Sequence, residues 1–116
     1  MGVSIKLTNP RDVIRVTERQ WQATVVEQCE LSGWLWYHTY DSRRSPPGFP
    51  DLVMVKKGRI IFAELKVGKN KVGKAQQEWL DLLKVNKGVE VYVWRPEDLQ
   101  EVINILFKRR KRAPRS

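Results

Sequence analysis

The chain has few of the residues and segments that mark secreted or membrane proteins. Cys29 is its only cysteine, which excludes an intramolecular disulfide and leaves too few thiolates for a zinc site. No apolar stretch approaches the roughly 18–20 residues needed to cross a bilayer. The N-terminal segment MGVSIKLTNP lacks the apolar core of a signal peptide. We therefore expect a cytoplasmic protein.

Acidic residues are scarce relative to basic ones. The 116 residues include 22 Lys and Arg but 13 Asp and Glu, which gives a net charge of +9. Six of the positive charges lie in the C-terminal segment KRRKRAPRS, which contains no acid. We expect one domain over residues 1–107, followed by a basic tail over 108–116. Nucleic acid is the first candidate partner and an anionic membrane surface the second; a solvated tail without a partner is the alternative.

Apolar spacing and turn residues predict the element order α-β-β-β-α-β-α. The first helix begins after Thr17, which has the capping-box spacing to Gln20, and ends at Gly33. The remaining elements are predicted as strands over 34–40, 51–56, 59–66 and 89–94 and helices over 74–86 and 96–107. The hairpin strands 51–56 and 59–66 are apolar on both faces. We therefore expect an α/β fold in which they lie in the middle of a sheet covered on each side by helices.

Two acids and a lysine lie at the open end of this hairpin. If residues 57–58 form a two-residue turn, the register of the ladder places Asp51 opposite Glu64. Directly opposed residues project to the same face, with Cβ atoms about 4.5–5.5 Å apart. Lys66 follows Glu64 by two residues and points to the same face. The sequence thus predicts a cluster of two carboxylates and one amine.

Two carboxylates this close repel each other unless a cation lies between them or one takes up a proton. Oxygen ligands suit Mg²⁺ or Mn²⁺, and the carbonyl of Leu65 could supply a further one. The Lys66 ammonium could orient an attacking water or stabilise developing negative charge. The alternative is an exposed strand-end pair of Glu64 and Lys66, with Asp51 as a strand cap. The matched register and the preceding Gly-x-Pro favour the metal site.

Basic residues flank the acidic cluster on both sides and predict contacts with the phosphates of a nucleic acid. The candidates are Arg43, Arg44, Lys69, Lys71, Lys74, Lys108, Arg109, Arg110, Lys111 and Arg112. Each one is also typical of a solvated loop or tail. His38 is interpreted as a packed strand residue rather than a general base.

The combined motifs resemble a known family. The segments GFPDLVMV and IIFAELK, followed by Gln76, Trp79 and VEVYVWRP, look like the virus-type replication-repair nuclease (VRR-NUC) domain of the PD-(D/E)xK nuclease superfamily. The resemblance covers about residues 17–106. It implies a restriction-endonuclease-like α-β-β-β-α-β core with a mixed sheet. It also implies that Asp51 and Glu64 hold the metal and that Lys66 is the catalytic lysine.

The resemblance further implies an acid on the first helix and a glutamine on the helix after the ExK strand. These match Glu18 and Gln76. Glu18 lies three and seven residues before the inward-facing Trp21 and Val25, so it is preferred over Glu27, which falls off that stripe. Gln76 could reach the site from the helix start or only cap the helix.

Stand-alone members of the family resemble Holliday-junction resolvases that act as homodimers on branched DNA. The implied function is a Mg²⁺- or Mn²⁺-dependent DNA endonuclease, structure-selective, serving DNA repair, of phage or bacterial origin and with no membrane partner. A hypothesis from another class is a basic nucleic-acid-binding module without catalysis. That module would account for the charge and the tail but leaves Asp51, Glu64 and Lys66 unexplained.

Overall fold

The computed structural model describes residues 15–40 and 43–108. Its elements are, in order, α1 (Glu18–Leu31), β1 (Leu35–His38), β2 (Leu52–Lys56), β3 (Arg59–Leu65), α2 (Lys74–Lys84), β4 (Val89–Trp94), the 3₁₀ turn η1 (Pro96–Asp98) and α3 (Leu99–Leu106). The predicted element order is confirmed, with the last helix divided into η1 and α3. The tail residues Arg109, Arg110, Lys111 and Arg112 lie outside the described residues.

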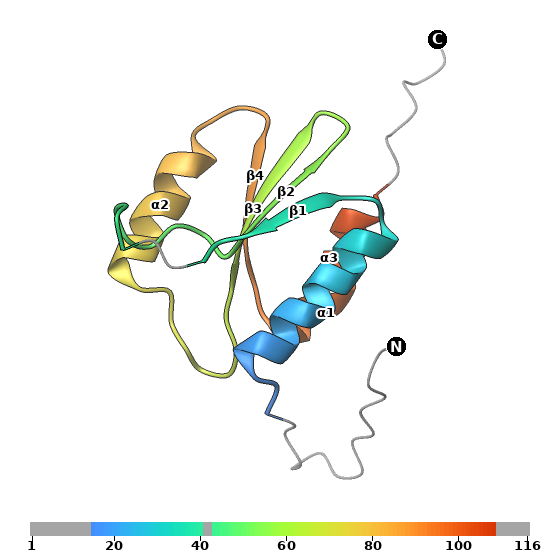
Figure 1. Ribbon diagram of the computed structural model, residues 1–116, viewed down its shortest axis with the longest axis horizontal. Coiled ribbons are helices and arrows are strands. Elements are labelled where there is room, and N and C mark those ends of the chain that lie inside the picture. The colour runs from blue at the N-terminus through green and yellow to red at the C-terminus, as the bar shows by residue number, and fades with distance from the viewer. Residues whose placement is uncertain (1–14, 41–42, 109–116) are drawn as a thin grey trace.

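The strands form one mixed sheet with the order β1-β2-β3-β4. Strands β1, β2 and β3 pair antiparallel, whereas β3 and β4 pair parallel. The parallel pair requires a crossover, which is provided by α2. Figure 1 shows α2 on one side of the sheet and α1 with α3 on the other. The predicted α/β fold with a mixed central sheet is confirmed.

One face of the sheet and the helices α1 and α3 enclose the main core. Helix α1 begins with the predicted capping box, in which Thr17 and Gln20 bond each other's main-chain N–H groups at 2.9 and 3.1 Å. The core consists mainly of Trp21, Val25, Cys29, Trp34, Leu52, Met54, Ile61, Ala63, Leu65, Trp94, Val102 and Leu106, all nearly or fully buried. Because every second residue of β2 and β3 belongs to it, this core fixes which face each strand residue takes.

The β2–β3 hairpin has the predicted turn and register. Lys57 and Gly58 have positive φ angles of 39° and 81°, as both central residues of a type I′ turn require. Pairing runs from Lys56 with Arg59 to Leu52 with Ala63. The register that sets the position of the acids is therefore confirmed.

Helices flank both faces of the sheet as predicted, but the second face is only partly covered. Helix α2 has 11 residues, about 16 Å of length, and packs mainly on β4. Val55 and Ile60, near the hairpin turn, remain 45% and 37% exposed, and Leu35 on the adjacent β1 is 77% exposed. The strands are apolar on both faces, but α2 is too short to cover the end of the sheet where the hairpin turns.

Candidate active site

The loop that leads into β2 is packed tightly onto the start of α2. Gly48 has a φ angle of 96°, and a Cβ atom there would lie 2.5 Å from the main-chain carbon of Ala75. The indole N–H of Trp79 donates to the carbonyl of Pro47 at 3.0 Å. The ring of Phe49 meets that of Trp79 edge-on, with centroids 5.0 Å apart. Only glycine fits at position 48, and these contacts fix the direction from which the chain enters β2.

A second set of contacts ties this loop to the end of β1. The Thr39 hydroxyl donates to the carbonyl of Pro50 at 2.8 Å, and the Thr39 N–H donates to the carbonyl of Asp51 at 2.9 Å. Pro50 itself is buried. The main-chain carbonyl of Asp51 is thus held by Thr39, the residue that follows β1, independently of the Asp51 side chain.

The carboxylates of Asp51 and Glu64 lie together at the end of the hairpin. Asp51 is one step beyond the Leu52–Ala63 pair, which places it opposite Glu64. Its Oδ2 accepts a hydrogen bond from the N–H of Leu65 at 2.8 Å. Glu64 is 1% exposed, and its Oε2 has no hydrogen-bond partner within residues 15–40 and 43–108. The structure therefore brings the two predicted acids together and leaves a buried oxygen unpaired.

This environment shifts the ionisation of Glu64. Burial, followed by the hydrogen bond and negative charge of Asp51, raises the pKa of Glu64 to about 9, and the nearby Lys66 ammonium opposes the rise. Without a cation, the pair therefore holds a proton at neutral pH. A buried, unpaired carboxylate oxygen costs free energy unless something binds it.

The donor set fits a divalent cation. In an extended strand the N–H and C=O of one residue point to the same edge, and the N–H of Leu65 points to Asp51. A Leu65 carbonyl directed to that side would add a neutral oxygen to the two carboxylates. Hard oxygen donors of this kind, completed by water, suit Mg²⁺ or Mn²⁺. Within the described part of the chain, no cluster of three or more His, Cys, Asp or Glu side chains is placed to hold a metal.

The family resemblance implies two further site residues, Glu18 and Gln76. Glu18 is the exposed first residue of α1, and Glu27 is half-buried on the same helix. Neither forms a three-acid group with Asp51 and Glu64 in the described residues. The Oε1 of Gln76 accepts a hydrogen bond from the N–H of Gly73 at 2.7 Å, which caps α2. The cap is one of the two alternatives for Gln76; a role of Glu18 or Gln76 at the site stays a prediction.

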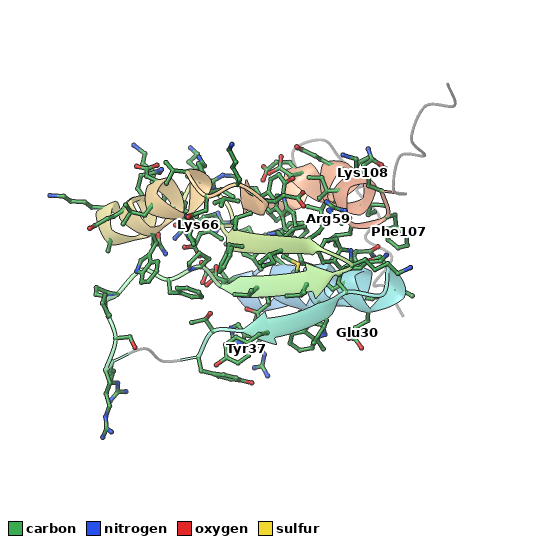
Figure 2. All side chains as sticks on the ribbon, turned by 90° about the horizontal axis from the view of Figure 1, so that it is seen from above. Glu30, Tyr37, Arg59, Lys66, Phe107 and Lys108 are labelled. Atoms are coloured by element: carbon green, nitrogen blue, oxygen red, sulfur yellow. The ribbon has the colours of Figure 1, made fainter. Side chains whose placement is uncertain are left out.

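The basic residues divide into a group near the acids and a group far from them. Lys69 and Lys71 are exposed in the loop that follows β3, and Lys74 is the exposed first residue of α2. Arg43 and Arg44 are exposed in the loop before β2. Lys66 and Lys108 lie toward opposite ends of the sheet (Figure 2), so Lys108 is remote from the acid pair. Seven residues of β3 separate these ends by roughly 20 Å.

Three residues that position the site were not found from the sequence. Arg95 donates to the carbonyls of Gly68 and Asn70 at 3.2 and 2.7 Å and so holds the loop that carries Lys69 and Lys71. Thr39 holds Asp51 as described. Gly48 was noted only as part of a Gly-x-Pro segment, and that segment does not indicate its packing on Ala75. No sequence signal identifies Arg95 or Thr39.

A mixed sheet of this order, with two carboxylates and a lysine at the end of its central hairpin, defines an α/β fold of the nuclease type. The VRR-NUC domain family matches residues 15–98, most of the chain, and the chain belongs to that family. Its function is accordingly of the nuclease type. A search of curated proteins found no match. No helix in residues 15–40 or 43–108 has the length and apolarity to cross a membrane.

Proposed function

We propose that the protein is a Mg²⁺- or Mn²⁺-dependent deoxyribonuclease that hydrolyses phosphodiester bonds. The observation that carries this proposal is the buried Oε2 of Glu64, which lies beside the carboxylate of Asp51 and has no hydrogen-bond partner among the described residues. A site that needs a cation for its charges to be stable is a site that selects for one. Family membership supplies the class of reaction.

Each residue of the site has a role in this proposal. Asp51, Glu64 and the Leu65 carbonyl hold the cation. When bound, the cation supplies positive charge that polarises the scissile phosphate. The Lys66 ammonium orients the attacking water and stabilises charge on the phosphate oxygens. Water adds to phosphorus, the bond from phosphorus to the sugar oxygen breaks, and that oxygen leaves with a proton.

The DNA backbone is held by the basic loops near the acids, in this proposal. Lys69 and Lys71 are exposed on a loop fixed by Arg95, and Arg44 is exposed in the loop that leads into β2. Positive charge on the segments before and after an acid pair suits a polyphosphate chain that passes over it. Lys108 and the tail would contact a more distant part of the duplex.

A homodimer acting on branched DNA is the finer part of the proposal. The partly covered sheet face exposes Leu35, Val55 and Ile60 together, an apolar surface of the kind that subunits bury. Two identical sites related by a two-fold axis would cut two strands symmetrically, as resolution of a four-way junction requires.

The nuclease proposal is tested by incubating linear and four-way-junction DNA with the full chain in Mg²⁺, in Mn²⁺ and in EDTA. We expect cleavage only with the cations. Lys66→Ala and Asp51→Asn should abolish cleavage while DNA binding in EDTA persists. Asp81→Asn, an exposed acid on α2, is the matched control and should cut normally. Cleavage at the wild-type rate by either site variant would show that the roles are misassigned, and binding without any cleavage would favour the non-catalytic module.

The finer proposal has its own tests. Mapping the cuts on a synthetic four-way junction should give two nicks placed symmetrically about the branch point. Sedimentation of the wild type should show a dimer, and Val55→Lys should shift it toward monomer. A monomeric wild type, or asymmetric nicks, would remove the homodimer from the proposal but leave the nuclease.

A further inference from the structure

An aromatic cavity lies between the end of β1, the loop that leads into β2 and helix α2. It has a volume of about 400 Å³, and its aromatic lining comes from Tyr37 of β1, Tyr40, Phe49 and Trp79 of α2. Thr39, Ser45 and Pro46 complete the wall. Among the described residues the lining is aromatic, hydroxyl-bearing and uncharged, which suits a flat, neutral group better than a phosphate.

The cavity is connected to the candidate active site through the main chain. Thr39, which lines the cavity, bonds the carbonyls of Pro50 and Asp51. Phe49 also lines it and lies two residues before Asp51; its ring packs edge-on against Phe62, with centroids 5.9 Å apart. Phe62 is in turn two residues before Glu64 on the same face of β3. A group in the cavity would therefore lie beside the phosphate held at the acids.

The walls differ in rigidity. Trp79 is fixed by its hydrogen bond to Pro47 and by its edge-on contact with Phe49. Tyr37 and Tyr40 are 61% and 76% exposed, so their rings are open to a ligand from solvent. Figure 2 shows Tyr37 and Lys66 toward the same end of the sheet, whereas Phe107 lies toward the other end.

We propose that this cavity binds one unpaired nucleobase of the DNA substrate, next to the scissile phosphate. Aromatic rings stack on any base, and the hydroxyls of Ser45 and the two tyrosines can bond a base edge. A base reaches such a cavity only when it is out of the duplex stack, which is easiest at a branch point, a gap or a single strand. This inference rests on the proposed nuclease function and names a structural feature that selects the substrate.

The test measures binding in EDTA, at fixed salt, of DNA with one unpaired nucleotide at a branch point. The fluorescence of 2-aminopurine at the unpaired position should be quenched by the wild type, while the same probe placed in a paired position should not. Replacing the unpaired nucleotide by an abasic one should weaken binding about tenfold, the effect of losing one stacked base.

Protein variants complete the test. Tyr40→Ala and Tyr37→Ala change exposed side chains, so both should fold. Each variant should bind the abasic DNA and the intact DNA, which has the unpaired base, with equal affinity. Tyr40→Phe keeps the ring and should restore the preference for the intact DNA. Phe107→Ala removes a ring that is 43% exposed at the opposite end of the sheet and should behave as the wild type.

The outcomes separate this inference from the nuclease proposal. If the wild type cuts DNA with Mg²⁺ but binds the abasic and intact DNA equally, the base-binding cavity is refuted and the nuclease stands. If it prefers the intact base in EDTA but never cuts, the cavity stands and the nuclease proposal fails. A preference unchanged by both tyrosine substitutions would place the base elsewhere and refute the assignment of the cavity.

Discussion

The acid pair makes the stability of the metal-free protein depend on pH in an unusual direction. A carboxyl group has a pKa of 4.5 in the reference state, and the pKa of Glu64 in the fold is about 9. Between these values the folded chain binds one proton more than the unfolded chain. The free energy of unfolding therefore falls as pH rises, by about 1.4 kcal/mol per pH unit. Most carboxylates that are ion-paired in a fold have a lowered pKa, and for them the free energy of unfolding increases as pH rises.

We predict a loss of about 3 kcal/mol in the free energy of unfolding between pH 6 and pH 8 in EDTA. For a domain of this size each kcal/mol changes Tm by roughly 4–8 °C, so Tm should fall by more than about 10 °C. Urea denaturation at each pH, followed by circular dichroism, measures the free energy directly. Saturating Mg²⁺ at pH 8 should recover much of the loss, because the cation binds the deprotonated pair.

Glu64→Gln is the decisive control. It keeps the shape of the side chain and removes the ionisable group. We expect a nearly flat profile between pH 6 and pH 8 and no stabilisation by Mg²⁺. If the wild type and Glu64→Gln lose stability in parallel, or if the wild type becomes more stable as pH rises, the reasoning about this carboxyl is wrong.

Three further predictions concern other parts of the molecule. Gly48→Ala should lower the free energy of unfolding by more than about 2 kcal/mol in denaturant titrations, because Gly48 has a positive φ and no space for a Cβ. Gly58 lies in open space in the turn, so Gly58→Asn should be nearly neutral. Arg59 holds the pKa of Glu90 below its usual value, so this pair should stabilise the fold above that pKa and lose its effect as acid protonates Glu90; Glu90→Gln should flatten stability profiles in that acidic range. Deleting residues 108–116 should weaken DNA binding and reduce the slope of log K against log salt by about one per lost phosphate contact; an unchanged slope would show that the tail does not contact DNA.

The register of the hairpin was predictable because it depends on local chemistry. A two-residue turn fixes the pairing of the strands, and the side-chain period of two then fixes the face of every residue. Asp51 and Glu64 could therefore be paired from sequence letters alone. The same applies to Thr17 and Gln20, whose capping box involves residues three apart.

Features that depend on contacts between distant segments were not predictable. Gly48 packs on Ala75 and Arg95 bonds the loop at Gly68, and no local pattern encodes either contact. The partly open sheet face depends on where α2 lies on the sheet, and apolar residues such as Val55 look the same in sequence whether covered or exposed. The charge state of Glu64 likewise depends on its burial, which is set by packing from several elements.

The alternation along β3 separates the stability of the domain from its chemistry. Ala63 and Leu65 face the core under α1 and α3, whereas Glu64 and Lys66 face the site. A buried carboxylate that repels its neighbour destabilises the fold, and the apolar core on the other face offsets that cost. Substitutions such as Leu65→Ala should therefore reduce stability first. Substitutions of Glu64 and Lys66 should reduce activity and leave the metal-free fold intact. At alkaline pH, Glu64→Gln should make the fold more stable.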